Sequence, residues 1–534
     1  MARANRTPDD ALRGWLVVTT LLLVLAGWIA GFLLYYRVPK SMIIKGVWFG
    51  ILATPSNPVL WVGPFIGLML GVVLFIYGAI RWTTKFGGAE YMRHLRGPRM
   101  ENQYALRSRT KSGSGQLRFM DTPVPRDVES THFLAGGSTG TGKSQCIAEY
   151  IESEQERGER TICIDPDGGF MRHFFRPGDV ILNPFDARGQ GWSVFNEIRS
   201  SFDCEQYAIS MIPRSPSTEQ ESWNSMARTI VSETLHVLIR NNELSTDRLV
   251  HWLTSASNRD LQTLLAGTPA EGCFHGAEET LASIRVVLTQ YVTPHKYLAS
   301  GSFSFRDFIE NSEGNVWVTW RQDQLQALKP LISCWTDVIC AAVLSMSDDR
   351  DRGLHLILDE LDSLEKLNYL VDAATKGRKK GLRILAGIQS LAQLRRTYGD
   401  DDALTLRNSL RSVALFGVAE MDTYTAEEFS RGLGEQTVIR RNDSVSVGGR
   451  GGSRGTTGTR QDTERVVSPA EIHLLPNLTG YLKFAGNYPI ARVKLQYKAR
   501  PDVIDPMVMA EQYSKPTLLR EEWIESARAA GLSM

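Results

Sequence analysis

An eight-residue glycine-rich segment carries the clearest chemistry in the sequence. It runs from Gly137 to Ser144 and fits the pattern G-x-x-x-x-G-K-[ST] at every fixed position. In such a loop the glycines let backbone N–H groups turn toward phosphate oxygens, the lysine neutralises the β- and γ-phosphates, and the serine hydroxyl is a ligand for Mg²⁺. The pattern therefore predicts that ATP and Mg²⁺ are the cofactors. The expected ligands are Gly137, Ser138, Thr139, Gly140, Thr141, Gly142, Lys143 and Ser144.

The flanking segments have the form that a phosphate-binding loop needs. His132–Ala135 is a short apolar run, typical of a buried strand. Gln145–Gln155 has helical periodicity, with Ile147 and Ile151 on one face. Strand, glycine loop and helix in this order are the setting that the motif requires, and the helix start adds its positive dipole end. The alternative, a flexible glycine turn, requires neither flank.

Two adjacent acids follow a second apolar run. Leu354–Leu358 predicts a buried strand, and Asp359 and Glu360 come directly after it, at the end where parallel sheets bind ligands. We expect Asp359 to hold Mg²⁺ together with Ser144, and Glu360 to orient and deprotonate the attacking water. An Asp-Glu pair is typical of hydrolysing ATPases. The alternative is a helix start whose acids interact with the helix dipole.

Two further side chains fit the same reaction. Gln389 follows the apolar run Leu382–Ile388 and could sense the γ-phosphate, or be an ordinary polar residue that closes a strand. Arg378 lies in the basic turn Gly377–Gly381 and could act as an arginine finger on the site of a neighbouring subunit, or be solvated. With Lys143 and Glu360, these are the expected catalytic residues.

Other strands are expected around these motifs. They are Thr161–Ile164, which we expect beside the strand of the glycine loop with Asp165 in a structural role, and Asn315–Trp320, Val413–Val418, Tyr481–Phe484 and Ala491–Tyr497.

Two long uncharged runs open the chain. Trp15–Tyr36 and Val59–Ile80 are each long enough, at roughly 33 Å as helices, to cross a bilayer core. A signal peptide would have a shorter apolar core and a cleavage site of small residues. A buried hairpin is the other alternative. We therefore expect a two-helix transmembrane anchor, with spans at about 15–36 and 59–80.

The segment between the glycine motif and the acid motif is longer than one nucleotide-binding sheet needs. Phe195–Ser300 lacks strand alternation and contains helical patterns such as Trp223–Ile239. We therefore expect an all-α domain inserted into an α/β domain. Ser444–Thr459, rich in glycine, serine and arginine, predicts a mobile loop that contacts nucleic acid or serves as a linker. The expected organisation is an anchor at 1–100, an α/β domain at 101–195 and 301–510, the helical insertion at 196–300, and a tail at 511–534.

Composition sets limits on function. The 534 residues carry 60 basic and 59 acidic side chains, so any contact with nucleic acid must be local, in a loop or a pore. The six cysteines form no C-x-x-C pair, which argues against a zinc site and favours buried thiols in a reducing compartment.

Taken together, the layout resembles the type IV coupling proteins of conjugative plasmids. The likeness is carried by the two-span hairpin, Gly137–Ser144, Leu356–Glu360, Gly377–Gly381 and Gly387–Ser390. Pro177–Asp186 is also similar.

The resemblance implies a RecA-like P-loop ATPase domain, a membrane-distal all-α domain and a hexamer around a channel. It also implies binding of single- or double-stranded DNA, recruitment of a relaxase within its relaxosome, and contact with components of a type IV secretion channel. The location would be the bacterial inner membrane, with two spans and most of the chain in the cytoplasm. Lys143, Ser144, Asp359 and Glu360 carry over as the nucleotide, metal and water residues, and so do Gln389 and Arg378.

Three other functions remain open on the sequence. They are a chromosome-partition DNA translocase, an ATPase for protein-only secretion, and a non-catalytic membrane scaffold that binds nucleotide. DNA binding with stimulation of hydrolysis would separate the ATPase for protein-only secretion, and phosphate release by the soluble fragment would separate the non-catalytic scaffold.

Overall fold

The computed structural model describes residues 8–37, 54–82, 93–275, 278–448 and 452–514, together with single residues at 52, 525 and 528. The chain divides into two units, Met1–Gly88 and Ala89–Met534.

The first unit is a pair of apolar helices. They are α1 (Pro8–Tyr36) and α3 (Val62–Trp82), with the short η2 (Thr54–Ser56) and η3 (Pro58–Trp61) between them. The helices touch through glycines: a Cβ placed on Gly27 would lie 2.3 Å from the carbonyl oxygen of Gly63. The small-residue spacing of these runs therefore marks their contact, as close helix packing requires.

The apolar segment Val17–Tyr36 of α1 is long and apolar enough to cross a membrane. The expected second span, 59–80, coincides with η3 and α3, but the side chains at 75 and 77–80 lie outside the described residues. Gln322–Ser345 also has the length and hydropathy of a span, yet it is mostly buried inside the second unit and is a core helix there.

The second unit is built on a sheet of ten described strands, in the order β2-β13-β12-β9-β3-β8-β7-β4-β6-β5. All neighbours from β9 to β5 are parallel, whereas β12 is antiparallel to both β9 and β13. The bounds are β2 (Met100–Asn102), β3 (Phe133–Gly136), β4 (Arg160–Pro166), β5 (Val180–Leu182), β6 (Val316–Trp320), β7 (Leu354–Leu358), β8 (Leu382–Ile388), β9 (Ser412–Leu415), β12 (Thr479–Lys483) and β13 (Ile490–Lys494).

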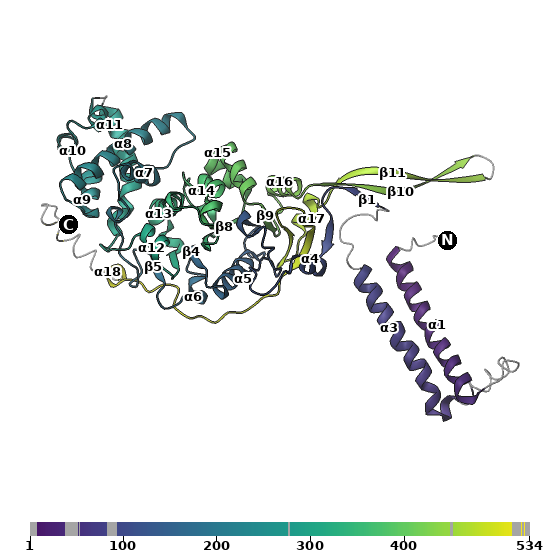
Figure 1. The fold of residues 1–534 in the computed structure, drawn as a ribbon. Coiled ribbons are helices and arrows are strands. Elements are labelled where there is room, and N and C mark those ends of the chain that lie inside the picture. Colours follow the sequence, from purple (N-terminus) through teal and green to yellow (C-terminus); the bar gives the residue numbers. More distant parts are fainter. Residues whose placement is uncertain are drawn as a thin grey trace. The chain divides into compact units, whose positions relative to one another are not determined.

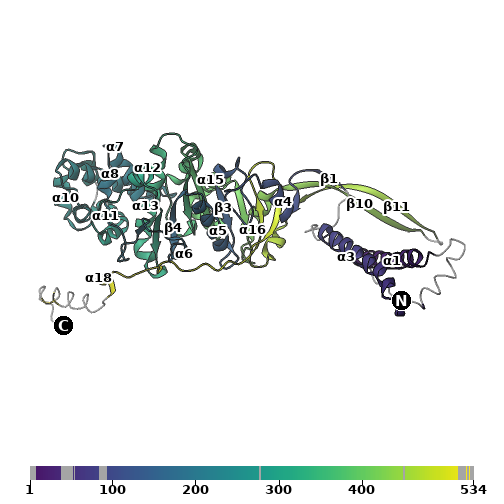
Figure 2. The same ribbon diagram turned by 60° about the horizontal axis from the view of Figure 1, so that its bottom comes forward.

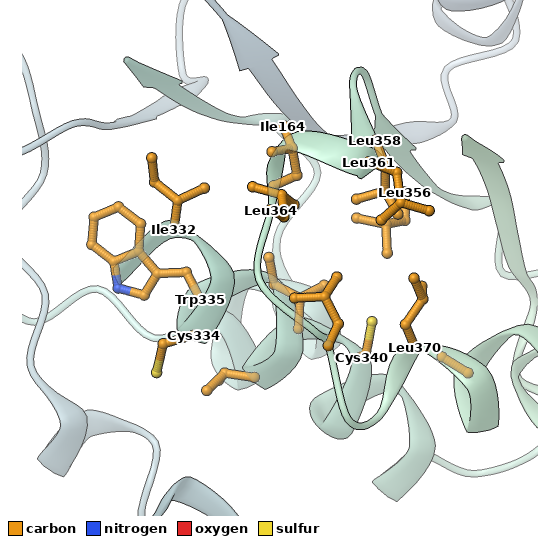
Figure 3. Packing of buried hydrophobic residues seen from close by; sticks show 14 of the residues in the cluster. Ile164, Ile332, Cys334, Trp335, Cys340, Leu356, Leu358, Leu361, Leu364 and Leu370 are labelled. Carbon is orange, nitrogen blue, oxygen red and sulfur yellow. The ribbon is translucent and has the colours of Figure 1, made fainter. Parts of the chain in front are cut away.

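Helices cover both faces of this sheet, which explains why its central strands are apolar without alternation. On one face, α5 (Lys143–Glu156) and α6 (Met171–Phe174) pack against Ile357 of β7. On the other face, α13 (Leu325–Ser345) and α14 (Leu370–Lys376) pack against Leu356 and Leu358. Figure 3 shows this second layer, with Trp335 and Ile332 of α13 near the strand side chains. The six cysteines are free, and all but Cys273 are buried.

A helical region is inserted between β5 and β6. Among described residues 196–275 and 278–300 it contains no strand, and α7 packs against α13. Figure 1 shows these helices gathered beyond the β5 edge of the sheet. The bounds are α7 (Phe202–Met211), α8 (Thr218–Arg240), α9 (Thr246–Val250), η6 (His251–Ser255), α10 (Asn258–Leu264), η7 (Pro269–Phe274), α11 (Glu278–Val292) and η8 (Thr293–Tyr297). The expected inserted helical domain is confirmed, and the predicted helix 223–239 lies within α8.

The remaining helices and turns connect these layers. They are α4 (Gln103–Thr110), η4 (Glu129–Thr131), η5 (Val194–Asn196), α12 (Phe305–Asn311), η9 (Gln322–Gln324), η10 (Leu361–Ser363), η11 (Gly377–Lys380), α15 (Leu391–Ser409), α16 (Thr423–Leu433), α17 (Pro469–His473) and α18 (Glu511–Ser514).

The expected neighbour of the glycine-loop strand is wrong. Strand β3 lies between β8 and β9, and β4, which contains Thr161–Ile164, lies between β7 and β6. The chain moves outward after β4 and returns later, so that β7 and β8 enter the sheet between β3 and β4. Hydrophobic runs predict strands but contain no information on their order.

The expected mobile loop at Ser444–Thr459 is also wrong for the described residues. Strands β10 (Glu435–Gly448) and β11 (Gly452–Arg465) pair antiparallel along their whole length, and β1 (Arg93–Arg96) pairs with β10 near its start. The ribbon extends away from the main sheet (Figures 1 and 2). Its serine and threonine content suits strands, and backbone pairing stabilises glycine positions that composition alone assigns to a loop.

After β13 the chain forms a strap, residues 495–510, along the unit (Figures 1 and 2). Backbone N–H groups in this strap donate to the Gln145 side chain at the start of α5, to the carbonyl of Arg172 on α6, and to the carbonyl of Phe185. The strap therefore passes the amino end of α5, where the glycine loop ends.

Candidate functional site: a phosphate-binding loop facing paired carboxylates

The glycine loop is held between the carboxyl ends of two strands. The Gly137 N–H donates to the carbonyl of Ile388 on β8 at 3.2 Å, and the Ser138 N–H donates to the carbonyl of Gly417 after β9 at 2.8 Å. Gly140 and Gly142 have φ values of 77° and 126°, a region that favours glycine. These bonds and conformations keep the loop curled at the edge of the sheet, ahead of α5.

Lys143 is the first residue of α5, and its side chain is buried. Its ammonium group donates to the carbonyl of Gly137, which folds the side chain back over the loop. Burial lowers the pKa of Lys143, while the nearby charges of Asp359, Asp362 and Glu360 oppose that shift. The structure thus brings the predicted lysine and the predicted acids together. Ser144 is exposed in the first turn of α5.

Asp359 and Glu360 directly follow β7, as predicted. A Cβ on Gly387 of β8 would lie 2.8 Å from the Asp359 Oδ1 atom, so this carboxylate needs a glycine beside it. Burial, and then the charge of Glu360, raise the pKa of Asp359 to about 7, against the effect of Lys143. Glu360 has a left-handed backbone, with φ of 59°, a conformation that non-glycine residues adopt mostly at functional sites or turns.

Gln389 links the acid to the glycine loop. Its Nε2 atom donates to Glu360 Oε1 at 2.9 Å, and its Oε1 atom accepts from the hydroxyl of Thr139 at 3.4 Å. The amide therefore lies between the residue expected to activate water and the loop expected to hold phosphate. Arrival or departure of a phosphate group at the loop can influence Glu360 through this one side chain.

Asp362 is a member of the site that the sequence reasoning missed. Its Oδ2 atom accepts the Gln389 N–H at 3.1 Å. Its Oδ1 atom is buried and has no hydrogen-bond partner among the described residues. Burial raises the pKa of this carboxyl group. The available signal was a third acid, three residues after Asp359, in the run Asp-Glu-Leu-Asp.

Asp165 lies at the end of β4 and is buried. It accepts hydrogen bonds from the N–H groups of Phe170 and Met171 at the start of α6. Burial raises its pKa to about 7. These bonds are those of a structural cap, in line with the structural role that we expect for it.

Arg378 is not part of this site within one chain. It lies in η11, before the start of β8, and its Nε atom donates to the hydroxyl of Ser130 at 3.0 Å. Gln389 follows the other end of β8, a strand of seven residues and therefore roughly 20 Å long. Any action of Arg378 on a nucleotide must then be on the site of another copy.

The sequence and the fold match known proteins over most of the chain. Residues 116–496 match the family described as "Type IV secretion-system coupling protein DNA-binding domain". The Coupling protein TraD of Escherichia coli (strain K12) is 31% identical over 401 residues, which cover 72% of this chain and 55% of TraD. The match thus spans about half the length of that relative.

Two solved structures give the same picture at higher identity. The bacterial conjugative coupling protein TrwBdeltaN70 is 42% identical, with a TM-score of 0.76, over 80% of this chain and 99% of that one. The plasmid coupling protein TrwB in complex with ADP and Mg²⁺ is also 42% identical, with a TM-score of 0.74, over 80% of this chain and 100% of that one.

Proposed function

Since the chain belongs to the type IV secretion-system coupling proteins, we propose that it is an ATP-hydrolysing motor that moves DNA toward a type IV secretion channel in conjugation. The observation that carries this proposal is the convergence of Lys143, Asp359, Glu360 and Gln389 at one edge of the sheet. The related TrwB has been solved with ADP and Mg²⁺ and with a non-hydrolysable ATP analogue, which supports the same ligands here.

The residues of the site fit ATP and Mg²⁺. The curled loop offers backbone N–H groups to the phosphates, and Lys143 exchanges its bond with the Gly137 carbonyl for the β- and γ-phosphate oxygens. Ser144 and Asp359 would hold Mg²⁺, whose charge neutralises the phosphates when it is bound. In the described part of the chain no group of three or more His, Cys, Asp and Glu side chains could hold a metal ion, so Mg²⁺ would need further ligands such as water and phosphate oxygens.

Glu360 and Gln389 would carry out the water chemistry. Glu360 accepts the proton of the attacking water, and the hydrogen bond from Gln389 orients its carboxylate for that task. Because Gln389 also contacts Thr139 of the glycine loop, loss of the γ-phosphate changes the position of Gln389 and, through it, of Glu360. Loops that move in response to this change would displace the DNA.

The position of Arg378 supports a ring of identical subunits. It lies at the amino edge of β8, away from the site of its own chain, so it would act as a finger in trans on the γ-phosphate bound by a neighbour. We propose a hexamer around a channel for DNA, with the relaxase of a relaxosome as the cargo protein.

The first unit would anchor this motor in the bacterial inner membrane. Many apolar side chains of α1 and α3 are exposed, including Leu21, Leu34 and Phe65, as expected for helices that face lipid. We propose two spans, with both termini and the ATPase in the cytoplasm where ATP is available. Of the domains expected from the sequence, we propose the RecA-like domain at 101–195 and 301–510, the helical insertion at 196–300 and a tail at 511–534. The anchor, expected at 1–100, would be the first unit, Met1–Gly88, because β1 and Met100 of β2 belong to the second unit.

The test is hydrolysis and DNA transfer measured on the same preparations. Lys143→Ala should lower DNA-stimulated ATP hydrolysis by about 10²- to 10³-fold and abolish transfer, because the γ-phosphate loses its main positive partner. Ser222→Ala, which removes an exposed hydroxyl on α8 that, among the described residues, bonds only to the Thr218 carbonyl of the same helix, is the control. If wild-type protein hydrolyses ATP but DNA has no effect on the rate, the DNA motor is excluded and protein-only export is favoured.

Mixed oligomers extend this test to Arg378. Lys143→Ala and Arg378→Ala subunits should each be inactive alone, whereas their mixture should regain part of the activity. Some interfaces then combine an intact glycine loop with an intact arginine. Absence of any rescue in verified mixed oligomers would exclude a finger in trans.

A further inference from the structure

A third acid, Asp362, ties the turn after β7 to the turn after β8. Its Oδ2 atom accepts the backbone N–H of Gln389 at 3.1 Å. Burial raises the pKa of this carboxyl group, and the N–H groups of Gln389 and Ser390 oppose that shift because they stabilise the charged form. The other oxygen, Oδ1, is buried and has no hydrogen-bond partner among the described residues. The contact that Asp362 makes is therefore with the backbone that follows β8.

The core holds Asp362 in place. Leu361 and Leu364, on either side of it, are buried and belong to the hydrophobic layer that covers β7 (Figure 3). Asp362 itself is only half-buried and meets the Gln389 N–H on the side of the turn that the leucines leave free. Since two leucines fix the turn, Asp362 can position Gln389 without depending on a flexible loop.

Gln389 is held at its backbone and at both ends of its amide. Its Nε2 atom donates to Glu360 Oε1 at 2.9 Å, and its Oε1 atom accepts the Thr139 hydroxyl at 3.4 Å. A glutamine side chain has three rotatable bonds, and fixing it costs more rotamer entropy than fixing a short side chain. If its backbone were free to move, the amide would leave the one position from which it reaches both partners.

We propose that Asp362 is a positioning residue for ATP hydrolysis that acts by holding the backbone of Gln389. With this bond in place, the Gln389 amide reaches Glu360 and the glycine loop at the same time. The inference rests on the proposed function and deepens it, because it adds the residue that fixes the link between loop and base. A displacement of about 1 Å at such a link can lower a rate about 10²-fold.

The experiment measures kcat and Km for ATP on the full-length protein, with Mg²⁺ and DNA. Asp362→Ala should lower kcat by about 10- to 100-fold and leave Km within about twofold of wild type, because Lys143 and the glycine loop still bind the phosphates. Asp362→Asn should recover most of the rate, since its amide oxygen still accepts the Gln389 N–H. Glu271→Ala is the matched control and should change neither constant: Glu271 also accepts a backbone N–H, from Gly267 at 2.8 Å, but lies in the helical insertion.

A double-mutant cycle tests whether Asp362 acts through Gln389. In a Gln389→Ala background, Asp362→Ala should lower kcat by no more than about twofold, because the amide that it positions is already absent. Additive losses would overturn the inference, since Asp362 would then contribute independently of Gln389. An Asp362→Asn variant as slow as Asp362→Ala would also overturn it, because the charge and not the hydrogen bond would then matter.

A second variant covers the case in which Asp362→Ala does not fold. Asp362→Glu keeps the charge and moves the carboxylate by one methylene, so it should bind a non-hydrolysable ATP analogue like wild type but hydrolyse ATP at least about tenfold more slowly. Wild-type kcat in Asp362→Glu would contradict the positioning role.

The outcomes separate this inference from the proposed function. If Asp362→Ala hydrolyses ATP like wild type while Lys143→Ala does not, the positioning role is wrong and the ATPase site stands. If the wild-type protein does not hydrolyse ATP, the proposed function fails and the positioning role fails with it.

Discussion

At the amino end of β7 the buried ring of His355 lies between Tyr150 and Glu159, whereas at the carboxyl end Asp359 and Glu360 face Lys143 across the glycine loop. Both ends carry acids and bases at the edge of the same strand. At the amino end, His355 Nε2 donates to the Glu159 carboxylate at 2.8 Å, and the Tyr150 hydroxyl is hydrogen-bonded to His355 Nδ1 at 3.0 Å.

Arginines complete the amino-end cluster. Arg157 pairs with Glu159 at 2.8 Å and with Glu129 at 2.9 Å, and Arg383 pairs with Glu159 at 3.2 Å. Burial alone would raise the pKa of Glu159, but the bond with His355 and the charges around it lower that pKa to about 2. These side chains are positioned by one another, which is the arrangement expected of a structural network.

The carboxyl-end cluster is arranged for a partner that is not protein. Asp362 Oδ1 is buried without a hydrogen-bond partner among the described residues, and the pKa of Asp359 is raised to about 7 instead of lowered. Acids are gathered there with Lys143 as the nearby cation. The difference teaches that charge at a strand end does not by itself indicate a reaction site. The amino-end cluster also holds a buried carboxylate oxygen without a hydrogen-bond partner among the described residues, on Glu154, but its acids lie among arginines and His355, whereas the carboxyl-end acids lie beside a glycine loop and its lysine.

The largest expected effect comes from replacing a glutamate with glutamine, in turn, in the cluster at each end of β7. Glu360→Gln should lower kcat by about 10²- to 10⁴-fold, because an amide cannot accept the proton of water, while ATP binding and thermal stability persist. Glu159→Gln is the matched control and should do the opposite, lowering the unfolding temperature with little change in kcat per folded molecule. Steady-state phosphate release and thermal unfolding are the two measurements. Normal hydrolysis by Glu360→Gln would exclude Glu360 as the base.

The contrast between the two ends also explains what the sequence predicted and what it did not. The carboxyl-end residues are linked to short motifs, so Lys143, Asp359, Glu360 and Gln389 could be identified before the fold was known. The amino-end residues come from separate segments with no shared motif, and nothing local marks His355 as their centre. Their association depends on strand order, which also placed β4 away from β3.

Arg378, near the amino end of β8, is another residue that a motif identifies but whose place in the fold the motif does not give. The sequence identified Arg378 as a possible finger, but only the fold shows that it lies at the opposite edge from Gln389. Element types were predicted well where apolar runs were long, as in β7, β8 and α8. The ribbon of β10 and β11 was missed because its order comes from backbone pairing along 14 residue pairs and not from an apolar pattern.

The second prediction concerns stability at the amino end. His355→Ala should lower the free energy of unfolding by about 3 kcal/mol or more, because it leaves a cavity and removes the partner of the buried Tyr150 hydroxyl and of Glu159. Chemical denaturation of the purified protein measures this loss. The Km for ATP and the kcat per folded molecule should remain within about twofold of wild type. If His355→Ala instead lowers kcat at unchanged stability, the two ends are not separate in function.

The smallest effect is the pH dependence of the same network. Burial lowers the pKa of His355 from its ordinary value of 6.5 to about 4. Between these values the unfolded chain binds a proton that the folded chain does not. The stabilisation is therefore complete above pH 6.5 and is lost as the pH falls toward 4, by up to about 1.4 kcal/mol per pH unit.

A variant isolates this contribution from the other titrating groups. The buried His132 and His295 have pKa values lowered to about 4 and change stability in the same direction, whereas Asp165 and Asp337, with pKa values raised to about 7, oppose them. The total slope of wild type is therefore a difference between these contributions. The change in slope caused by His355→Gln combines the loss of the His355 proton with a rise in the pKa of Glu159, which the bond from His355 holds low. Unfolding free energies measured between pH 7 and pH 5 should lose that slope in the variant, while Phe202→Ala, a change of an exposed side chain on α7, should keep it. An unchanged slope in His355→Gln would mean that His355 titrates in the folded protein as it does in the unfolded chain; a change of the opposite sign would mean that it stays protonated in the folded protein, and the amino end would then be an ion pair with a charged histidine.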